Sequence, residues 1–368
     1  MNKVPYINLS AQWEDERTEL LPLIEKVLSS GSYVGGESID RFETAVAEYC
    51  GTRFAVALNS GTDALVCALH ALGIGKGDEV ITPPNSFIAS TAAIAHTGAT
   101  PVFVDVKRDQ NLDPSLIEAV LTDKTRAIMP VHLTGRLADM SAINAIAMRH
   151  NLYVIEDAAQ SIGSKWNGQT SGSLGAIGCF SAHPLKNLNA CGDGGFVTTD
   201  DEDLASQIRL FRNHGLVDRN NVEQFGMVSR MDALQAEILT YRLGRLPAVI
   251  EARRRNARIY HETLDPELVY FPPERDCEFN TYHTFVIQTE RRDELRQDLR
   301  SRGIETAIHY PVPIHLQPAA SGLKYNEGDF PATERQARRI LTLPVNQFLA
   351  EGDIRYVAES VNELAVKG

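Results

Sequence analysis

Residues 79–157 alternate between short, nearly continuous apolar runs and longer segments in which apolar residues recur every three or four positions. The first pattern is typical of buried strands and the second of helices. Together they predict strands at 79–84, 100–106, 125–135 and 152–157, and helices at 87–98, 114–121 and 138–151. Because the strands are apolar along their whole length, we expect a parallel sheet with helices on both faces.

The pattern changes in the second half of the chain. A helix is expected at 201–215, a polar loop at 216–228, and then a long helix that begins at a Ser229 cap and is interrupted near Gly244 to Pro247. Beyond it, the pattern predicts strands at 282–288 and 305–311, and helices at 292–303, 332–343 and 353–365. A long connecting helix followed by this shorter set of elements indicates a second, smaller unit.

Composition narrows the class of protein. A chain of 368 residues favours two domains, and a net charge of −12 gives no support for nucleic-acid binding. We find no segment of signal-peptide type and no apolar run near the ~18 residues of a membrane span, so we expect a cytoplasmic protein without a membrane partner. Five cysteines without a CxxC pair indicate reduced thiols and no metal site.

The strongest chemical signal is Lys186, in the segment GCFSAHPLKNLNACGDGGFVTTD at 178–200. Glycines let the backbone approach a bulky ligand, and small or apolar neighbours lower the pKa of an amine by desolvation. Only a neutral amine attacks a carbonyl, so this setting favours a lysine that forms a Schiff base. The alternative is a solvated surface lysine, which is the usual state of a lysine taken alone.

A second signal is the turn and helix start in LNSGTDALVCALHALG at 58–73, where Thr62 and Asp63 open the helix. The free N–H groups and the dipole of such a helix start bind phosphate groups. A plain N-cap explains the same residues. Both interpretations stay open on this segment alone.

Polar and aromatic residues follow the predicted strands at their carboxyl ends, where ligands bind in sheets of this kind. Asp157 is either a carboxylate that holds a protonated heterocyclic nitrogen or the N-cap of the next segment, and Gln160 follows it closely. Phe87 is either a stacking partner for a flat ring or a core residue. His132 is either a pocket contact or a histidine with satisfied hydrogen bonds, and the second is favoured.

Taken together and in order, the motifs resemble those of the DegT/StrS-type nucleotide-sugar aminotransferases, which are pyridoxal-phosphate enzymes of fold type I, the aspartate aminotransferase fold. The matching segments are SGTDAL (60–65), GDEVITPPNSF (77–87), PVFVDV (101–106), VIEDAAQSIG (154–163), SAHPLKNLNACGDGG (181–195), RNHG (212–215), SRMDALQA (229–236) and IHYPVPIHLQP (308–318). The resemblance implies an α/β fold with a large cofactor-binding domain over 1–240, whose mostly parallel sheet is of the seven-stranded type, and a smaller α+β domain over 241–368.

The resemblance also implies roles for single residues. Lys186 matches the lysine that binds pyridoxal 5'-phosphate and then moves the proton, and Asp157 matches the acid that pairs with the pyridinium nitrogen. The other cofactor contacts that it implies are Gln160 near the ring hydroxyl, Phe87 on the ring face, and Gly61, Thr62 and Ser181 at the phosphate. The chain departs from the family pattern at Val228, where an asparagine commonly reaches the phosphate of the neighbouring subunit, and at Ala182, where an aromatic residue is more usual.

The implied activity is transfer of an amino group from L-glutamate to the keto sugar of a nucleotide-linked substrate, in amino-sugar biosynthesis. Candidates for the donor carboxylate are Arg212, Asn213, His214 and Arg230, without a ranking, and candidates for the sugar or diphosphate are His309 and Tyr310. Two alternatives remain: a sugar dehydratase, although related dehydratases carry histidine in place of Lys186, and a non-catalytic regulatory homologue.

The substrate and the assembly follow from the same resemblance. The segments IHYPVPIHLQP and GDFPATER (328–335) most resemble the 3-oxo branch of the family, so we expect amination at C-3 of a dTDP-linked 6-deoxyhexose, with a 4-oxo sugar as the alternative. We also expect a homodimer in which the partner chain completes each active site. The loop 216–228 is the candidate for the crossing segment.

Overall fold

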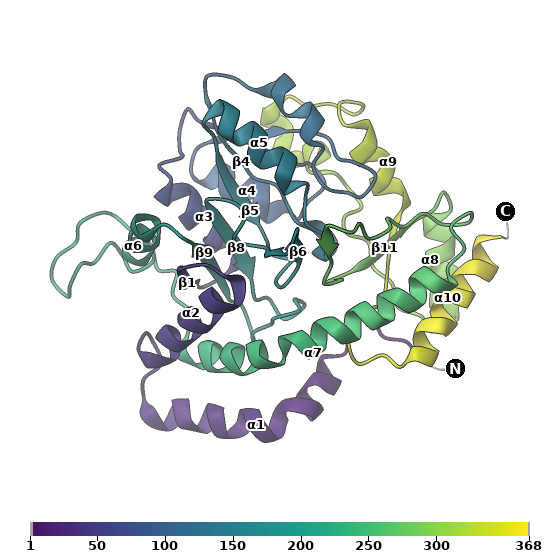
Figure 1. Ribbon diagram of the computed structural model, residues 1–368, viewed down its shortest axis with the longest axis horizontal. Helices are drawn as coiled ribbons and strands as arrows, with labels where there is room; N and C mark the ends of the chain where they lie inside the picture. Colours follow the sequence, from purple (N-terminus) through teal and green to yellow (C-terminus); the bar gives the residue numbers. More distant parts are fainter. Residues whose placement is uncertain (1–2, 367–368) are drawn as a thin grey trace.

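The central sheet follows the expected alternation of strands and helices. In this computed structural model, which describes residues 3–366, seven strands pair in the order β1-β9-β8-β5-β4-β2-β3 (Figure 1). Their bounds are β1 (Phe54–Leu58), β2 (Glu79–Thr82), β3 (Thr100–Phe103), β4 (Thr125–Ile128), β5 (Tyr153–Asp157), β8 (Ile177–Ser181) and β9 (Gly195–Thr199). Strand β9 runs antiparallel to both neighbours, and the other pairs are parallel. The prediction of a mostly parallel α/β sheet is confirmed.

Helices cover both faces of this sheet, and β1 illustrates how the sequence assigns side chains to each face. Ala55 and Ala57 pack in a cluster with residues of α2 (Glu37–Cys50), whereas Val56 and Leu58 pack with residues of α3 (Gly61–Ala71). Successive side chains of a strand point to opposite faces, so a strand that is apolar throughout buries both. The other helices around the sheet are α4 (Ile88–His96), α5 (Met140–His150) and α6 (Glu202–Phe211).

Helix α7 (Ala233–Thr263) continues for 31 residues from the sheet towards the C-terminal elements (Figure 1). The interruption predicted near Gly244 to Pro247 is therefore wrong. Pro247 removes one backbone donor, but the buried side chains of Leu246 and Ile250 on either side of it hold the helix in place. The helix crosses the expected boundary between residues 240 and 241 without a break.

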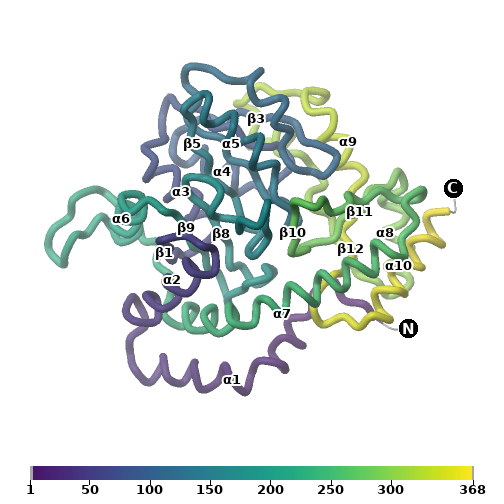
Figure 2. Tube along the Cα trace, viewed as in Figure 1, coloured from purple at the N-terminus to yellow at the C-terminus, as the bar shows by residue number. Residues whose placement is uncertain are grey.

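The C-terminal elements enclose a core of their own. Strands β11 (Phe285–Gln288) and β12 (Ile340–Leu343) pair, and they pack with α8 (Arg292–Ser301), α10 (Glu351–Ala365) and the end of α7. Val4, from the other end of the chain, is buried in this core and bridges to Ile304. The N-terminal segment at Val4 therefore packs in the same core as α10, on the side of the molecule where Figure 2 shows α8 and α10.

Three predicted elements differ from those that the structure describes. The strand predicted at 305–311 is wrong, since only Ala307 forms a bridge, to Thr342; Pro311 and Pro313 lack the N–H groups that a longer ladder needs. The helix predicted at 114–121 is two short 3-10 turns, and the one at 332–343 divides into α9 and β12.

The remaining helices and strands are α1 (Leu9–Ser30), β6 (Lys165–Trp166), β7 (Gln169–Thr170), β10 (Glu278–Phe279), α9 (Pro331–Arg339), and the 3-10 turns Pro114–Leu116, Glu118–Val120, Leu133–Gly135, Ile314–Leu316 and Pro318–Leu323. Within residues 3–366, no helix is both long enough and apolar enough to cross a membrane.

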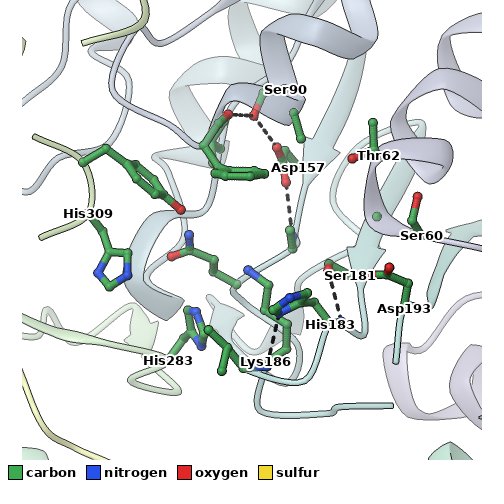
Figure 3. A pocket seen from close by; sticks show the side chains of 18 of the residues that line it. Ser60, Thr62, Ser90, Asp157, Ser181, His183, Lys186, Asp193, His283 and His309 are labelled. Carbon is green, nitrogen blue, oxygen red and sulfur yellow. Dashed lines mark hydrogen bonds between the residues drawn. The ribbon is translucent and has the colours of Figure 1, made fainter. Parts of the chain in front are cut away.

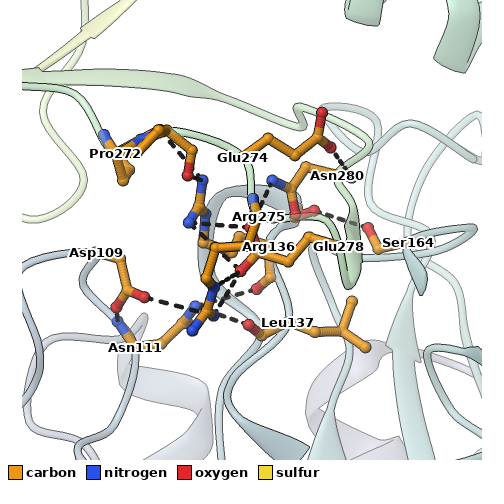
Figure 4. A network of polar contacts seen from close by, with 12 residues as sticks. Asp109, Asn111, Arg136, Leu137, Ser164, Pro272, Glu274, Arg275, Glu278 and Asn280 are labelled. Atoms are coloured by element: carbon orange, nitrogen blue, oxygen red, sulfur yellow. Dashed lines mark hydrogen bonds and ion pairs between the residues drawn. The ribbon is translucent and has the colours of Figure 1, made fainter. Parts of the chain in front are cut away.

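A buried charge network joins the segment after α7 to the large sheet (Figure 4). Arg136 donates to the carbonyl groups of Pro272 and Pro273 at 3.2 and 2.7 Å, and it lies 3.1 Å from Oε2 of Glu278. Arg275 lies 2.5 Å from the other carboxylate oxygen of Glu278. Because the Glu278 carboxylate is fully buried, these partners compensate a charge that would otherwise be costly to bury. The network holds in place a segment that carries His283 to the cavity described next.

Candidate active site

One cavity of about 460 Å³ collects most of the residues singled out in the sequence (Figure 3). It lies at the carboxyl ends of the parallel strands, where the C-terminal unit meets the sheet. The residues that were expected and that line it are Gly61, Thr62, Phe87, Asp157, Gln160, Ser181, Lys186, His309 and Tyr310. Figure 3 shows Thr62, Ser60 and Ser181 on one side of the cavity and His283 and His309 on the opposite side.

The corner formed by α3 and the end of β8 is suited to a small anion. Ser60 is the N-cap of α3 and accepts a hydrogen bond from Asp63 N–H at 3.1 Å. The N–H groups of Gly61 and Thr62 belong to the first helical turn and have no partner within the helix. A side chain at Gly61 would put its Cβ 2.6 Å from Cβ of Ser181, so glycine is what allows this close approach. The corner therefore presents backbone donors and hydroxyl groups together.

Asp157 closes β5 and is buried at the base of the cavity. Its Oδ2 accepts a hydrogen bond from the Ser90 hydroxyl at 2.6 Å, and its Oδ1 accepts one from Ala159 N–H at 3.2 Å. Burial raises the pKa of Asp157, while these two hydrogen bonds and the nearby Lys186 lower it. A cation placed against this carboxyl group would favour its ionised form. Ser90 lies on α4, and no motif had indicated it.

Lys186 reaches into the cavity from the turn after β8, where its N–H donates to the carbonyl of His183 at 2.8 Å. Burial lowers the pKa of the Lys186 amine to about 8, although Asp157 acts in the opposite direction. A lowered pKa of this amine is what its small and apolar neighbours in the sequence had predicted. The residue is only partly exposed and its side chain lines the cavity, so it is not the solvated surface lysine of the alternative interpretation.

Phe87, Gln160 and Tyr310 form one wall. The ring of Phe87 is 55% exposed, which excludes the core alternative, and it lies 5.7 Å from the ring of Tyr310. Gln160 Oε1 accepts a hydrogen bond from Thr134 N–H at 2.8 Å. Burial raises the pKa of Tyr310 to about 12, and a hydrogen bond with Gln160 opposes this effect. The phenol is therefore a neutral hydrogen-bonding group at neutral pH.

The opposite wall contains residues that the sequence had not indicated, apart from His309. Burial lowers the pKa of His309 to about 4, and Nδ1 of the same ring lies 3.0 Å from the Thr342 hydroxyl. Burial also lowers the pKa of His283 well below its usual range. Residues missed from the sequence are Tyr6, Ser60, Ser90, His183, Asp193, Arg253, His283 and Asn346. Asp193 and His183 belong to the glycine-rich run, and Ser60 opens the motif SGTDAL, so these three could have been found from the sequence. The others lie in segments without a motif.

The four residues expected to hold the donor carboxylate are not part of this wall. Arg212 donates to Glu43 and to the carbonyl of Ala57, both at 2.5 Å. Arg230 donates to Asn213 at 3.2 Å, and none of the four, His214 included, lines the cavity. These four residues lie near the end of α6 and the loop that follows it. Within this chain, Arg212 is paired with an acidic residue and not with the cavity.

His132 is a histidine whose hydrogen bonds are satisfied. Ala138 N–H donates to its Nδ1 at 3.2 Å, so Nε2 carries the proton and donates to Glu156 at 2.9 Å. Glu156 also accepts from the N–H groups of Gly172, Leu174 and Gly175. The favoured interpretation of His132 as a structural residue is confirmed.

Comparison with known proteins agrees with this fold and site. A sequence model of the DegT/DnrJ/EryC1/StrS aminotransferase family matches residues 14–362, and the chain belongs to this family. It is 41% identical over 364 residues to a pleiotropic regulatory protein of Geobacillus stearothermophilus, which covers 98% of both chains. It is 43% identical over 368 residues to a dTDP-3-amino-3,4,6-trideoxy-alpha-D-glucose transaminase of Streptomyces venezuelae, which covers 99% of this chain and 96% of the relative. A crystal structure of S. venezuelae DesV in complex with a ketimine intermediate has a TM-score of 0.97 and 42% identity over 100% of both chains.

Proteins of this family use pyridoxal 5'-phosphate, and the residues present fit that group. The corner at Gly61 and Ser181 matches a phosphate, because it offers backbone donors at a helix start. The buried carboxyl group of Asp157 lacks a directly bonded cation in residues 3–366 and matches a protonated ring nitrogen. Phe87 offers an exposed ring face, and Lys186 offers an amine between these groups.

Proposed function

We propose that this protein is a pyridoxal-phosphate aminotransferase that moves an amino group from L-glutamate to C-3 of a dTDP-linked 3-oxo-6-deoxyhexose. The observation that carries the aminotransferase activity is the position of Lys186 in the same cavity as Asp157 and the anion corner, where desolvation lowers the pKa of its amine. A general acid–base group works best when its pKa is near the working pH. A pKa of about 8 meets that condition.

The side chains have distinct tasks in this scheme. When bound, the cofactor supplies the electron sink that acidifies the substrate carbon beside the nitrogen. The Lys186 amine would take the proton from that carbon and deliver it to the cofactor carbon on the other side of the same nitrogen. Asp157, held by Ser90 and Ala159, keeps the heterocycle oriented. The neutral His309 and Tyr310 contribute polar groups for the hydroxyl groups of a sugar.

The choice of sugar rests on the 3-oxo branch resemblance and on the S. venezuelae relative, whose name specifies a 3-amino sugar on dTDP. A 4-oxo sugar is the competing substrate. Discrimination between the two is expected to be large, because the wrong ketone leaves buried polar groups unpaired. A direct competition of dTDP-linked 3-oxo and 4-oxo 6-deoxyhexoses, scored by kcat/KM and repeated with UDP-linked sugars, tests the choice. Preference for the 4-oxo sugar would overturn it and leave the aminotransferase activity intact.

A regulatory role is the competing class of function, since one relative is called a pleiotropic regulatory protein. Retention of Lys186 and its lowered amine pKa favour catalysis instead. Borohydride reduction of the purified protein should attach a pyridoxyl group to the Lys186 peptide. Lys186→Ala should lose turnover, whereas the control Lys165→Ala, on an exposed lysine, should not. A label on another lysine would contradict the assignment.

We also propose a homodimer with shared active sites. The loop 216–228 projects from the body of the molecule in Figure 1, and its exposed apolar side chains include Phe225 at 98% exposure. Exposed apolar groups of this kind favour a protein partner. Replacing 219–225 by a glycine-serine linker should inactivate the enzyme, and mixing that variant with Lys186→Ala should restore about a quarter of the activity, because half of the dimers are mixed and each has one complete site. A fully active monomer would refute the proposal.

Val228, where the family commonly has asparagine, lies in this loop and is half exposed. An amide there could donate to a phosphate, and valine cannot. Val228→Asn should therefore slow the loss of cofactor on dialysis, with little change in turnover. Faster loss would contradict the idea that this position faces the phosphate of the partner.

A further inference from the structure

Arg253 is a buried cation without an anionic partner. It lies on α7, is 6% exposed and lines the cavity. Its Nη1 donates to the carbonyl groups of Tyr282 and His283 at 3.3 and 3.1 Å. Its Nε has no hydrogen-bond partner, and no carboxylate in residues 3–366 forms an ion pair with it.

Other buried arginines of the chain are different. Arg136 is paired with Glu278, and Arg242 lies 2.6 Å from Glu16. Leaving a buried charge unpaired costs several kcal/mol in general, because the ion loses its water without gaining a counter-charge. Burial lowers the pKa of Arg253 to about 10, so the guanidinium is still charged at neutral pH. An unpaired cation that faces a cavity is arranged to receive an anion from outside the chain.

His283 supplies a second free group on the same wall. Its Nδ1 is buried and has no hydrogen-bond partner, and its ring is neutral at pH 7 because burial and the neighbouring cations lower its pKa. Lys186 and Arg253 line the same cavity, and each lies close enough to His283 to lower the pKa of its ring. An anion bound by Arg253 would therefore lie in the cavity of Lys186, beside the His283 ring that both cations influence.

The chemistry of the two substrates decides which anion fits. In an amino acid, the α-carboxylate is attached to the carbon that carries the reacting nitrogen, so its binding group must lie next to Lys186. In a nucleotide sugar, the diphosphate is separated from the keto carbon by the sugar ring, and the nucleoside extends farther. A buried cation near Lys186 therefore matches a carboxylate rather than a diphosphate.

We propose that Arg253, with His283 beside it, holds a carboxylate of the amino donor. This inference rests on the proposed aminotransferase function, and it places at α7 a role for which the sequence had suggested Arg212, Asn213, His214 and Arg230. Donor and sugar occupy the cavity in turn. Arg253 is consequently required chiefly in the half-reaction that loads the amino group.

That half-reaction can be measured without any sugar. Glutamate converts the yellow enzyme to its colourless amino form and leaves as 2-oxoglutarate, so the half-saturating glutamate concentration follows from the loss of absorbance. Arg253→Gln keeps a donor for the carbonyl groups and removes the charge. It should raise the half-saturating concentration by roughly 10- to 100-fold, as expected for loss of a charge-assisted hydrogen bond. Binding of dTDP, measured by calorimetry, should stay unchanged.

The matched control is Arg254→Gln. Arg254 is the next residue, but it pairs with Glu274 at 2.7 Å and does not line the cavity. Arg254→Gln should therefore have the same half-saturating glutamate concentration as the wild type. Rescue gives a further check, since Arg253→Lys should recover part of the lost affinity by restoring the charge.

Several results would overturn the inference. An unchanged glutamate dependence in Arg253→Gln would do so, and so would weakened dTDP binding with normal glutamate binding, which would assign the guanidinium to the diphosphate. If the wild type did not react with glutamate, the proposed function would fail, and calorimetry with glutarate on both proteins would still decide about Arg253. If Arg253→Gln did not fold, the test would use the wild type alone. The wild type should bind glutarate at least about tenfold more tightly than the uncharged glutaramide. Equal affinities for the two compounds would refute the inference.

Discussion

Removing the Ser90 hydroxyl should make the stability of the cofactor-free enzyme more dependent on pH. Ser90 donates to Asp157 at 2.6 Å, and this bond lowers a pKa that burial raises. A hydrogen bond to a charged group contributes about 1.5–3 kcal/mol. A hydrogen bond to the protonated carboxyl group contributes about 0.5–1.5 kcal/mol, so the two protonation states differ by about 1–1.5 kcal/mol. At 1.36 kcal/mol per unit, loss of the bond in Ser90→Ala should raise the pKa of Asp157 by roughly one unit.

The direction of the effect follows from proton linkage. A carboxyl group with a higher pKa in the folded than in the unfolded protein holds more protons when folded, so stability falls as the pH rises from the unfolded value through the folded value. As the pH rises towards 8 and Asp157 ionises, the loss of stability in Ser90→Ala should therefore grow towards about 1.5–3 kcal/mol. Near pH 3, below the ordinary carboxyl pKa that burial raises in this protein, the folded carboxyl group is protonated, and only the about 0.5–1.5 kcal/mol of a neutral hydrogen bond is lost.

Urea unfolding of the cofactor-free proteins at the two pH values measures this difference. Ser86→Ala is the control, because Ser86 donates to Ser90 at 3.1 Å and is not bonded to Asp157. Its effect should be small at both pH values. An equal loss of stability for Ser90→Ala near pH 3 and at pH 8 would refute the argument, since the hydroxyl would then not act through the charge on Asp157.

Two further predictions concern stability and the anion corner. Glu278→Ala leaves two arginines without their buried partner and should lower the free energy of unfolding by about 3–5 kcal/mol. The control Glu327→Ala removes one partner of an exposed pair and should change this free energy by less than about 1 kcal/mol. Similar values for the two variants in urea unfolding would contradict the prediction. Gly61→Ala would put a Cβ 2.6 Å from Ser181 and should weaken pyridoxal-phosphate binding at least about tenfold, whereas Gly244→Ala, with nothing within 4 Å, should leave the affinity unchanged. Equal cofactor affinities in a fluorescence titration would show that the corner can widen freely.

The sequence alone was informative where chemistry depends on local pattern. Apolar runs that end in Asp157, and a glycine-rich turn that carries Lys186, indicated a ligand site at one edge of a sheet, because the carboxyl ends of parallel strands meet there. The helix start at Gly61 indicated an anion corner by the same kind of reasoning. These side chains do lie in one cavity.

Local pattern was misleading where a residue has a competing partner elsewhere in the chain. Arg212 stands in a motif and is a reasonable ligand for a carboxylate, but the fold brings Glu43 to it. Pro247 predicts a break, but burial on both sides keeps α7 continuous. In both cases the deciding contact joins segments far apart in the sequence.

Only the tertiary structure could identify Arg253, Ser90 and His283. Arg253 lies in a run of three arginines on a helix that looks like a solvated face, and nothing local distinguishes it from Arg254. The difference is that Arg254 meets Glu274 whereas Arg253 enters the cavity without a counter-charge. Sequence determines which groups are available, but burial and pairing determine which charge remains free for a ligand, because desolvation and ion pairing depend on distances that only the folded chain defines.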